Sequence, residues 1–132
     1  MVAVTRGGDI GVDVELLRPV EHWQEISARY FHAREAAAIG GASSVNAPTS
    51  FMQCWTRKEA VLKLVGVGIN YPLREFCVPL GDDAHGCVHV PAHSSVAATR
   101  CWIQPLDPCA GYVAAVATVG EKSPARGMTL RM

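Results

Sequence analysis

The sequence lacks an excess of charge of either sign and lacks any long hydrophobic run. Its 132 residues include 12 Lys and Arg against 12 Asp and Glu, so the formal net charge is zero. Binding to duplex nucleic acid needs a clustered basic excess, and a membrane helix needs about 20 consecutive apolar residues. The longest apolar candidate, Tyr112–Val119, has only the length of a strand. We therefore expect no binding to nucleic acid and no membrane-spanning segment.

Paired cysteines and a secretory leader are also missing. The five cysteines form no Cys-x-x-Cys pair, and the first residues contain no signal-peptide core. These features are typical of a reduced, cytoplasmic protein, so we expect free and mostly buried thiols. The length and the 49% hydrophobic content predict a single folded domain over residues 1–120, followed by a flexible tail over residues 121–132.

Hydrophobic spacing predicts a first strand followed by helices. The segment Asp9–Glu15 alternates with a period of two, as a strand with one apolar face does. Thr49 or Ser50 is placed to cap the longest helix, and Gly66 is placed to end it. The predicted helices are Val20–Phe31, Ala33–Ile39 and Thr49–Val65.

Short apolar runs of strand length fill the second half of the chain. They are Phe76–Leu80, Cys87–Pro91, Val96–Gln104 and Gly111–Val119. A strand, then helices, then strands in a meander predict an α+β fold, in which an antiparallel sheet packs on the long helix.

Two carboxylates, Asp13 and Glu15, lie two residues apart on the first predicted strand, so they leave from the same face. The intervening Val14 is expected to point into the core. Adjacent carboxylates are costly without a cation or proton between them, and hard oxygen ligands of this kind suit Mg²⁺. Exposed strand faces also carry acids that bind no metal, so the pair alone leaves both interpretations open.

Glu59 and Lys63 lie four residues apart on the longest predicted helix and share a face. A solvated ion pair, contributing about 0.3–0.5 kcal/mol, accounts for this spacing. A carboxylate beside an ammonium can also act as a general base and as a charge stabiliser for a metal-bound phosphate.

Histidine and cysteine alternate near the middle of the chain, at His85, Cys87 and His89, and His93 follows. Side chains that share a strand face could in principle bind zinc. Gly86 and the strand pattern make a closed tetrahedral site awkward, and a polar edge strand is the simpler interpretation.

Two motifs, in order and with matching spacing, resemble the 4′-phosphopantetheinyl transferase superfamily. They are Gly11-Val-Asp13-Val-Glu15 followed by Arg18-Pro19, and Trp55-Thr-Arg-Lys58-Glu59-Ala60 with Lys63 and Gly66-Val-Gly68. The Asp-x-Glu form and the Trp before Lys-Glu-Ala are similar to the surfactin-synthetase-activating (Sfp) type. Enzymes of that type have two similar halves in one chain, and this chain resembles the second half.

The resemblance implies Mg²⁺-dependent transfer of 4′-phosphopantetheine from coenzyme A to a serine of an acyl or peptidyl carrier protein, which converts the apo form to the holo form. By motif, Asp13, Glu15 and Glu59 would hold Mg²⁺ against the coenzyme A pyrophosphate. Glu59 would deprotonate the serine, directly or through a water. Lys63 would stabilise charge on the phosphate or protonate the departing one.

Other residues receive supporting roles from the same resemblance. Arg18 and Lys58, together with Lys63, would contact coenzyme A phosphates or ribose, and Trp55 would pack under the site. Glu35 falls where the family has an acid and would support the metal ligands from outside.

Carrier proteins are acidic around their serine as a family trait, so a basic patch on this chain would help to bind them. Arg57, Lys58 and Arg74 are the candidates for such a patch.

Two functional classes follow from the resemblance. One is an active transferase assembled as a homo-oligomer. The other is a truncated, non-catalytic or partner-dependent half that keeps the fold and Mg²⁺ binding. A lone half would expose the apolar face that packs on the other half. We therefore expect self-association, or a missing N-terminal half.

Overall fold

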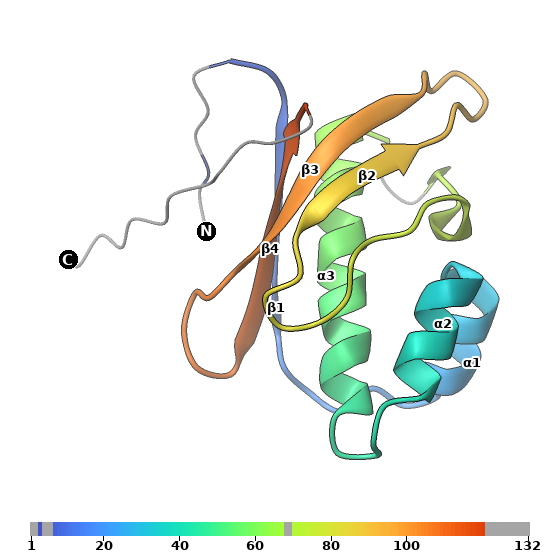
Figure 1. The fold of residues 1–132 in the computed structure, drawn as a ribbon, viewed down its shortest axis with the longest axis vertical. Coiled ribbons are helices and arrows are strands. Elements are labelled where there is room, and N and C mark those ends of the chain that lie inside the picture. Colours follow the sequence, from blue (N-terminus) through green and yellow to red (C-terminus); the bar gives the residue numbers. More distant parts are fainter. Residues whose placement is uncertain (1–2, 4–6, 68–69, 121–132) are drawn as a thin grey trace.

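The computed structural model describes residue 3 and residues 7–67 and 70–120, which form one antiparallel sheet and three α-helices (Figure 1). The predicted tail over residues 121–132 lies outside the described residues. None of the described helices is long and apolar enough to cross a membrane. In chain order the elements are β1 (Ile10–Leu16), α1 (Trp23–Tyr30), α2 (Ala33–Gly40), α3 (Ala47–Val65), a short 3₁₀ helix (Leu73–Glu75), β2 (Gly86–Val90), β3 (Thr99–Leu106) and β4 (Tyr112–Val119).

The sheet has the strand order β1-β4-β3-β2, and every neighbouring pair is antiparallel. β2, β3 and β4 form a meander, and β1 pairs with β4. Figure 1 shows α3 lying against one face of the sheet, with α1 and α2 on the side of α3 away from the strands. The α+β prediction of an antiparallel sheet packed on a long helix is confirmed.

The long helix begins and ends for different local reasons. α3 begins at Ala47, two residues before the predicted start, and its N-cap is Asn46 rather than Thr49 or Ser50. Pro48 falls in the first turn, where a missing N–H costs nothing. At the other end, Gly66 takes the left-handed conformation (φ 82°) and closes the helix as predicted.

The face of β1 that lies against the core is not the one predicted: the side of Asp13 is buried, and the side of Val14 is exposed. Asp13 is 6% exposed, whereas Val14 is 37% exposed and Leu16 49% exposed. Val14 therefore does not point into the core. The carboxylate-bearing face of β1, including Asp13 and Glu15, lies toward α3, and the apolar face lies away from it.

A close approach of β1 to α3 causes this reversal. A methyl group on Gly11 would lie 2.0 Å from the Ala60 carbonyl oxygen and 2.4 Å from the Leu64 backbone nitrogen. Only glycine lets the strand come this near to the helix backbone. Because side chains alternate along a strand, Asp13 and Glu15 then face the helix as well.

Part of the β-rich half is not a strand. The predicted strand Phe76–Leu80 follows the 3₁₀ helix within a stretch, the 73–82 segment, that forms no ladder with the sheet. Its backbone polar groups are bound by side chains instead. Arg57 of α3, for example, donates to the carbonyl oxygens of Pro79 at 2.7 Å and Gly81 at 2.6 Å. The prediction of a strand here is wrong because apolar residues alone do not reveal these partners.

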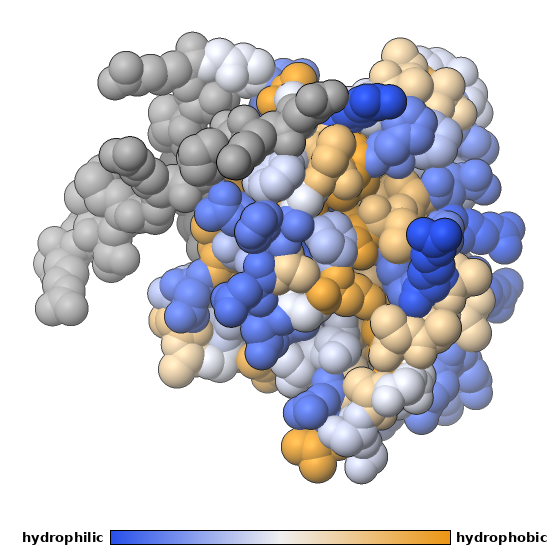
Figure 2. Space-filling view, in the orientation of Figure 1, coloured by the Kyte–Doolittle hydropathy of each residue, from blue (hydrophilic) through white to orange (hydrophobic). Residues whose placement is uncertain are grey.

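Apolar side chains are exposed on the sheet face away from α3. Leu16 on β1 pairs with Tyr112 on β4, and Val14 lies two residues along on the same face. We call Val14, Leu16 and Tyr112, which are 37–49% exposed, the open sheet face. Hydrophobic residues also lie exposed between hydrophilic ones on the side of the molecule that Figure 2 shows.

Candidate functional site

The structure brings together four of the side chains predicted to carry the chemistry. β1 supplies Asp13 and Glu15, and α3 supplies Glu59 and Lys63, which we call the carboxylate site. The Lys63 ammonium donates to Asp13 Oδ1 at 2.7 Å. The Asp13 side chain is 7% exposed, whereas that of Lys63 is 52% exposed. A buried carboxylate and a half-exposed ammonium therefore join strand to helix, 50 residues apart in the chain.

The two glutamates are close enough to Asp13 to sense its charge. Burial raises the pKa of Glu15, and the Asp13 carboxylate raises it further, while a hydrogen bond from Trp55 and the charge of Arg18 oppose the shift. Burial also raises the pKa of Glu59, and the charge of Asp13 adds to the shift, which Lys63 opposes. The site therefore holds more negative charge than its single ammonium offsets.

The donor chemistry of the carboxylate site fits a hard divalent cation. Asp13 Oδ2 is buried and has no hydrogen-bond partner in the part of the chain that the structure describes. A buried, unsatisfied carboxylate oxygen is costly, and Mg²⁺ prefers such oxygens. In residues 7–67 and 70–120, however, no three His, Cys, Asp or Glu side chains already form a metal-ligand set. Lys63 occupies Asp13 Oδ1 in this arrangement.

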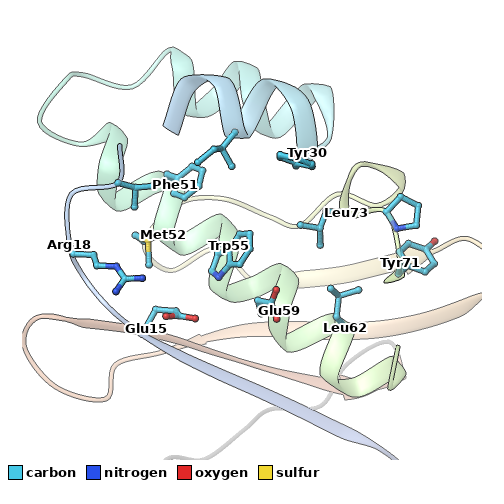
Figure 3. A pocket seen from close by; sticks show the side chains of 13 residues that line it. Glu15, Arg18, Tyr30, Phe51, Met52, Trp55, Glu59, Leu62, Tyr71 and Leu73 are labelled. Atoms are coloured by element: carbon cyan, nitrogen blue, oxygen red, sulfur yellow. The ribbon is translucent and has the colours of Figure 1, made fainter. Parts of the chain in front are cut away.

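A largely apolar pocket of about 670 Å³ opens beside the carboxylate site. Figure 3 shows Glu15 and Glu59 on the side of the pocket near the strands, with Tyr30 and Phe51 on the opposite side. Arg18 follows β1 and lines the pocket near Glu15. The site thus combines charged groups at one side with a largely apolar cavity that can hold an extended, mostly neutral group.

Most of this pocket was not predicted from the sequence. Phe51, Trp55, Glu59 and Leu62 line it from α3, at spacings of four, four and three residues that place them on one helix face. That spacing was available in the sequence, but an apolar helix face alone does not show whether it lines a pocket or packs in the core. Tyr71 lines the far end of the pocket from the stretch after α3, where the sequence has no periodic pattern that would predict such a role.

Trp55, expected to pack under the site, does lie beside it. Its ring centroid is 6.4 Å from that of Phe31, and the side chain is partly buried against the core. Its indole N–H also opposes the rise in the pKa of Glu15, an influence that the motif alone did not predict.

Lys58 does not face the pocket, which overturns its predicted contact with coenzyme A. The side chain is completely buried, and its ammonium lies 2.8 Å from Glu35 Oε1. It also donates to the carbonyl oxygens of Leu73 and Phe76, each at 2.6 Å. An ammonium has three donors. All three have oxygen partners, so none is left for a phosphate.

Glu35 is the buried partner that makes this arrangement possible. Its Oε1 accepts from the His32 backbone N–H at 2.9 Å, which forms the capping box of α2. Its Oε2 accepts from the Val78 N–H at 2.8 Å. Glu35 thus joins α2, α3 and the 73–82 segment, and its role is to hold the wall behind the pocket.

The predicted basic patch does not form. Arg57 is 2% exposed and Lys58 is fully buried, so both are unavailable to an acidic partner. Arg74 alone of the three candidates is exposed. Charged residues that follow one another on a helix point in different directions, and here the fold uses two of them internally.

The alternating histidines belong to the edge of the sheet. β2 is the outermost strand, opposite β1. His85 packs against the Trp102 ring at 5.3 Å between centroids, and His93 packs against the Tyr71 ring at 5.5 Å. These histidines lie on separate aromatic partners, which fits a polar edge strand better than a shared ligand set.

Comparisons with known proteins agree with the motifs. The sequence model of the 4′-phosphopantetheinyl transferase superfamily matches residues 9–117. The chain is 29% identical to the 4′-phosphopantetheinyl transferase psf-1 of Bacillus pumilus over 89% of its own length and 48% of that relative. It is 31% identical to the transferase ffp of Bacillus subtilis over 81% of its length and 45% of that relative. The chain therefore spans about half the length of these relatives.

A solved structure shows the same fold. The holo-(acyl-carrier-protein) synthase of Thermotoga maritima superposes with a TM-score of 0.53 at 12% identity, over 86% of this chain and 64% of that one. The likeness concerns the fold, whereas the match over residues 9–117 identifies the family. The chain belongs to the 4′-phosphopantetheinyl transferase superfamily.

Proposed function

We propose that this chain carries the catalytic carboxylates of an enzyme that transfers 4′-phosphopantetheine from coenzyme A to a serine of an acyl or peptidyl carrier protein. The observation that carries the proposal is the convergence of Asp13, Glu15, Glu59 and Lys63 beside an apolar pocket. The relatives named as 4′-phosphopantetheinyl transferases support the reaction class.

Asp13, Glu15 and Glu59 would hold Mg²⁺ in this proposal. A bound Mg²⁺ supplies charge neutralisation on the pyrophosphate and makes adenosine 3′,5′-bisphosphate a better leaving group. Asp13 Oδ2, which has no partner among the described residues, supports this assignment because it is a buried hard oxygen that needs one.

Glu59 accepts the proton of the carrier serine, directly or through a water. Burial raises its pKa, which makes its carboxylate a stronger base than an exposed glutamate. Lys63 stabilises the charge on the transferred phosphate, because its half-exposed side chain can reach toward the pocket.

Coenzyme A would lie with its phosphates near Arg18 and Lys63. Arg18 is exposed at the pocket beside Glu15, and its guanidinium suits phosphate oxygens. The neutral pantetheine chain would extend along the apolar pocket, which an anionic group would avoid.

A second copy of the chain, or the other half of a longer protein, would complete the cleft. The chain spans about half of the relatives it matches. The open sheet face (Val14, Leu16 and Tyr112) supplies an apolar surface for such a contact. We expect light scattering to give a mass above that of one chain, and a monodisperse monomer would contradict self-association. A non-catalytic half that keeps the fold and binds Mg²⁺ is the alternative.

The reaction is tested by the mass of a carrier protein. Apo carrier is incubated with coenzyme A, Mg²⁺ and the protein, and intact mass spectrometry detects the added phosphopantetheine. We expect a gain with the wild type and with Glu21→Gln, which changes an exposed carboxyl outside the site. Glu59→Gln should give none.

Two outcomes would contradict parts of this proposal. If the carrier gains no mass at high protein concentration while a full-length relative modifies it, the non-catalytic alternative holds. If Glu59→Gln transfers as fast as the wild type, Glu59 is not the base.

A further inference from the structure

The ion pair between Lys63 and Asp13 occupies the centre of the carboxylate site. Lys63 Nζ lies 2.7 Å from Asp13 Oδ1, and Asp13 is the acid whose charge both Glu15 and Glu59 sense. The Lys63 ammonium also opposes the rise in the pKa of Glu59, so a cation placed there interacts with both Asp13 and Glu59. The ammonium therefore occupies a position at which any cation is stabilised by the neighbouring carboxylates.

The two partners differ in freedom to move. The Asp13 side chain is 7% exposed and is fixed on β1 against α3, whereas the Lys63 side chain is 52% exposed and lies in the last turn of α3. A lysine carries its charge on a flexible four-carbon stem. Lys63 can therefore leave Asp13 without disturbing the backbone, and Asp13 cannot follow it.

The ion pair engages only one of the two oxygens of the Asp13 carboxylate, Oδ1. Asp13 Oδ2 is buried and unpartnered within the described residues, and those residues contain no ready metal-ligand set. A single ammonium leaves the charge of the three acids incompletely offset. A divalent ion would offset more of it, but it would repel the ammonium next to it.

We propose that Lys63 is a built-in counter-ion that competes with divalent metal for Asp13, so that metal binding releases Lys63 toward the substrate phosphate. This inference rests on the proposed function of the carboxylate site. In this proposal, the binding of the metal and the movement of Lys63 to the phosphate are coupled. Without metal, the ammonium neutralises Asp13 and stays away from the phosphate position.

Removing the ammonium should then strengthen metal binding. Lys63→Met keeps the length of the side chain and removes its charge. The lost ion pair has one buried and one half-exposed partner, so its contribution falls between that of exposed and of buried pairs, and we expect metal to bind about tenfold more tightly. If Lys63 did not compete with the metal for Asp13, its removal would leave the affinity for the metal unchanged or lower it.

Calorimetric titration of the metal-free protein with Mn²⁺ measures this directly. The matched control is Arg34→Met, which removes one positive charge from an exposed position on α2 away from the carboxylates. We expect wild-type affinity in the control and tighter binding in Lys63→Met. Unchanged or weaker binding in Lys63→Met, or no binding to any of the proteins, would overturn the competition.

A second measurement follows the ammonium itself by ¹⁵N NMR of lysine side chains. Lys58, whose ammonium is buried on three oxygens, provides an internal reference that Mg²⁺ should not change. We expect the Lys63 signal, assigned by its loss in Lys63→Met, to shift or broaden as Mg²⁺ is added. A Lys63 signal that stays constant up to saturating Mg²⁺ would refute its release.

These measurements contain no carrier protein and no coenzyme A, so they are independent of the transfer assay. Phosphopantetheine transfer without competition at Asp13 would support the proposed function and refute this inference. Competition without transfer would support the inference and favour the non-catalytic half.

Discussion

Gly11→Ala tests whether the contact between β1 and α3 builds the carboxylate site. The added methyl carbon would lie 2.0 Å from the Ala60 carbonyl oxygen and 2.4 Å from the Leu64 nitrogen, and both of these atoms belong to helix backbone. Real contacts of this kind are essentially never shorter than 3.0 Å, so strand and helix must separate by about 1.0 Å. Neither atom is the flexible end of a side chain, so a rotamer change cannot relieve the clash.

Overpacking of this kind costs about 3 kcal/mol. For a domain of this size that corresponds to a fall in melting temperature of about 12 °C. A separation of 1 Å would also carry Asp13 away from α3, so the 2.7 Å contact would persist only if the flexible Lys63 side chain extended to follow it. The variant should therefore lose stability, and the geometry of the carboxylate site should change with it.

Gly40→Ala is the matched control. Gly40 is the last residue of α2, and a methyl group there would meet nothing within 4 Å. Alanine in a helix is favoured over glycine by about 0.5–1 kcal/mol, so this variant should be slightly more stable than the wild type. Both substitutions change the same atoms and restrict the unfolded chain equally.

Urea unfolding followed by circular dichroism measures both variants, and the wild type provides the reference. The expected order of unfolding free energy is Gly40→Ala, wild type, Gly11→Ala. If Gly11→Ala unfolds within about 0.5 kcal/mol of the wild type, the strand tolerates a side chain there and the close approach is not what orients Asp13.

The remaining predictions concern buried groups. Lys58→Met should lower the unfolding free energy by about 3–5 kcal/mol, because Glu35 stays buried without its counter-charge; adding Glu35→Gln should recover part of the loss, and a double variant no better than the single one would contradict this. Burial raises the pKa of Cys101 to about 11, so iodoacetamide at pH 8 should label the exposed Cys87 and Cys109 and spare Cys101, as read by mass spectrometry of the native protein. The same shift makes the folded state hold its proton longer than the unfolded state, whose thiol titrates near 9.0, so stability should fall as the pH rises from 9 toward 11.

Local signals in the sequence predicted the helices and most of the strands. Gly66 marked the end of α3 because the left-handed conformation at this position is costly for residues other than glycine. The orientation of β1 was predicted wrongly, because the alternation of Val12 and Val14 has the form of a core face. Gly11 carried the missing information, but a glycine in a strand reveals a close approach only when its neighbour is known.

The acids and the lysine of the site were identified through motifs, and the fold places them together. Asp13 and Lys63 are 50 residues apart, and no periodicity relates them. The burial of Lys58 was missed because its partner Glu35 lies on another helix and its other partners are backbone carbonyls. Lysine is almost never fully buried unless it is paired, so its exposure was the natural expectation.

The way α3 binds the 73–82 segment has a consequence for mutational tolerance. Arg57 and Lys58 bind carbonyl oxygens of that segment, and a carbonyl is the same in every residue. Substitutions at Leu73 and Pro79 therefore leave these bonds intact as long as the backbone keeps its path. A saturation-mutagenesis scan should find two invariant cations on the helix, and it should find that the partly buried Leu73 and Pro79 vary more freely than the core residues Phe76 and Val78.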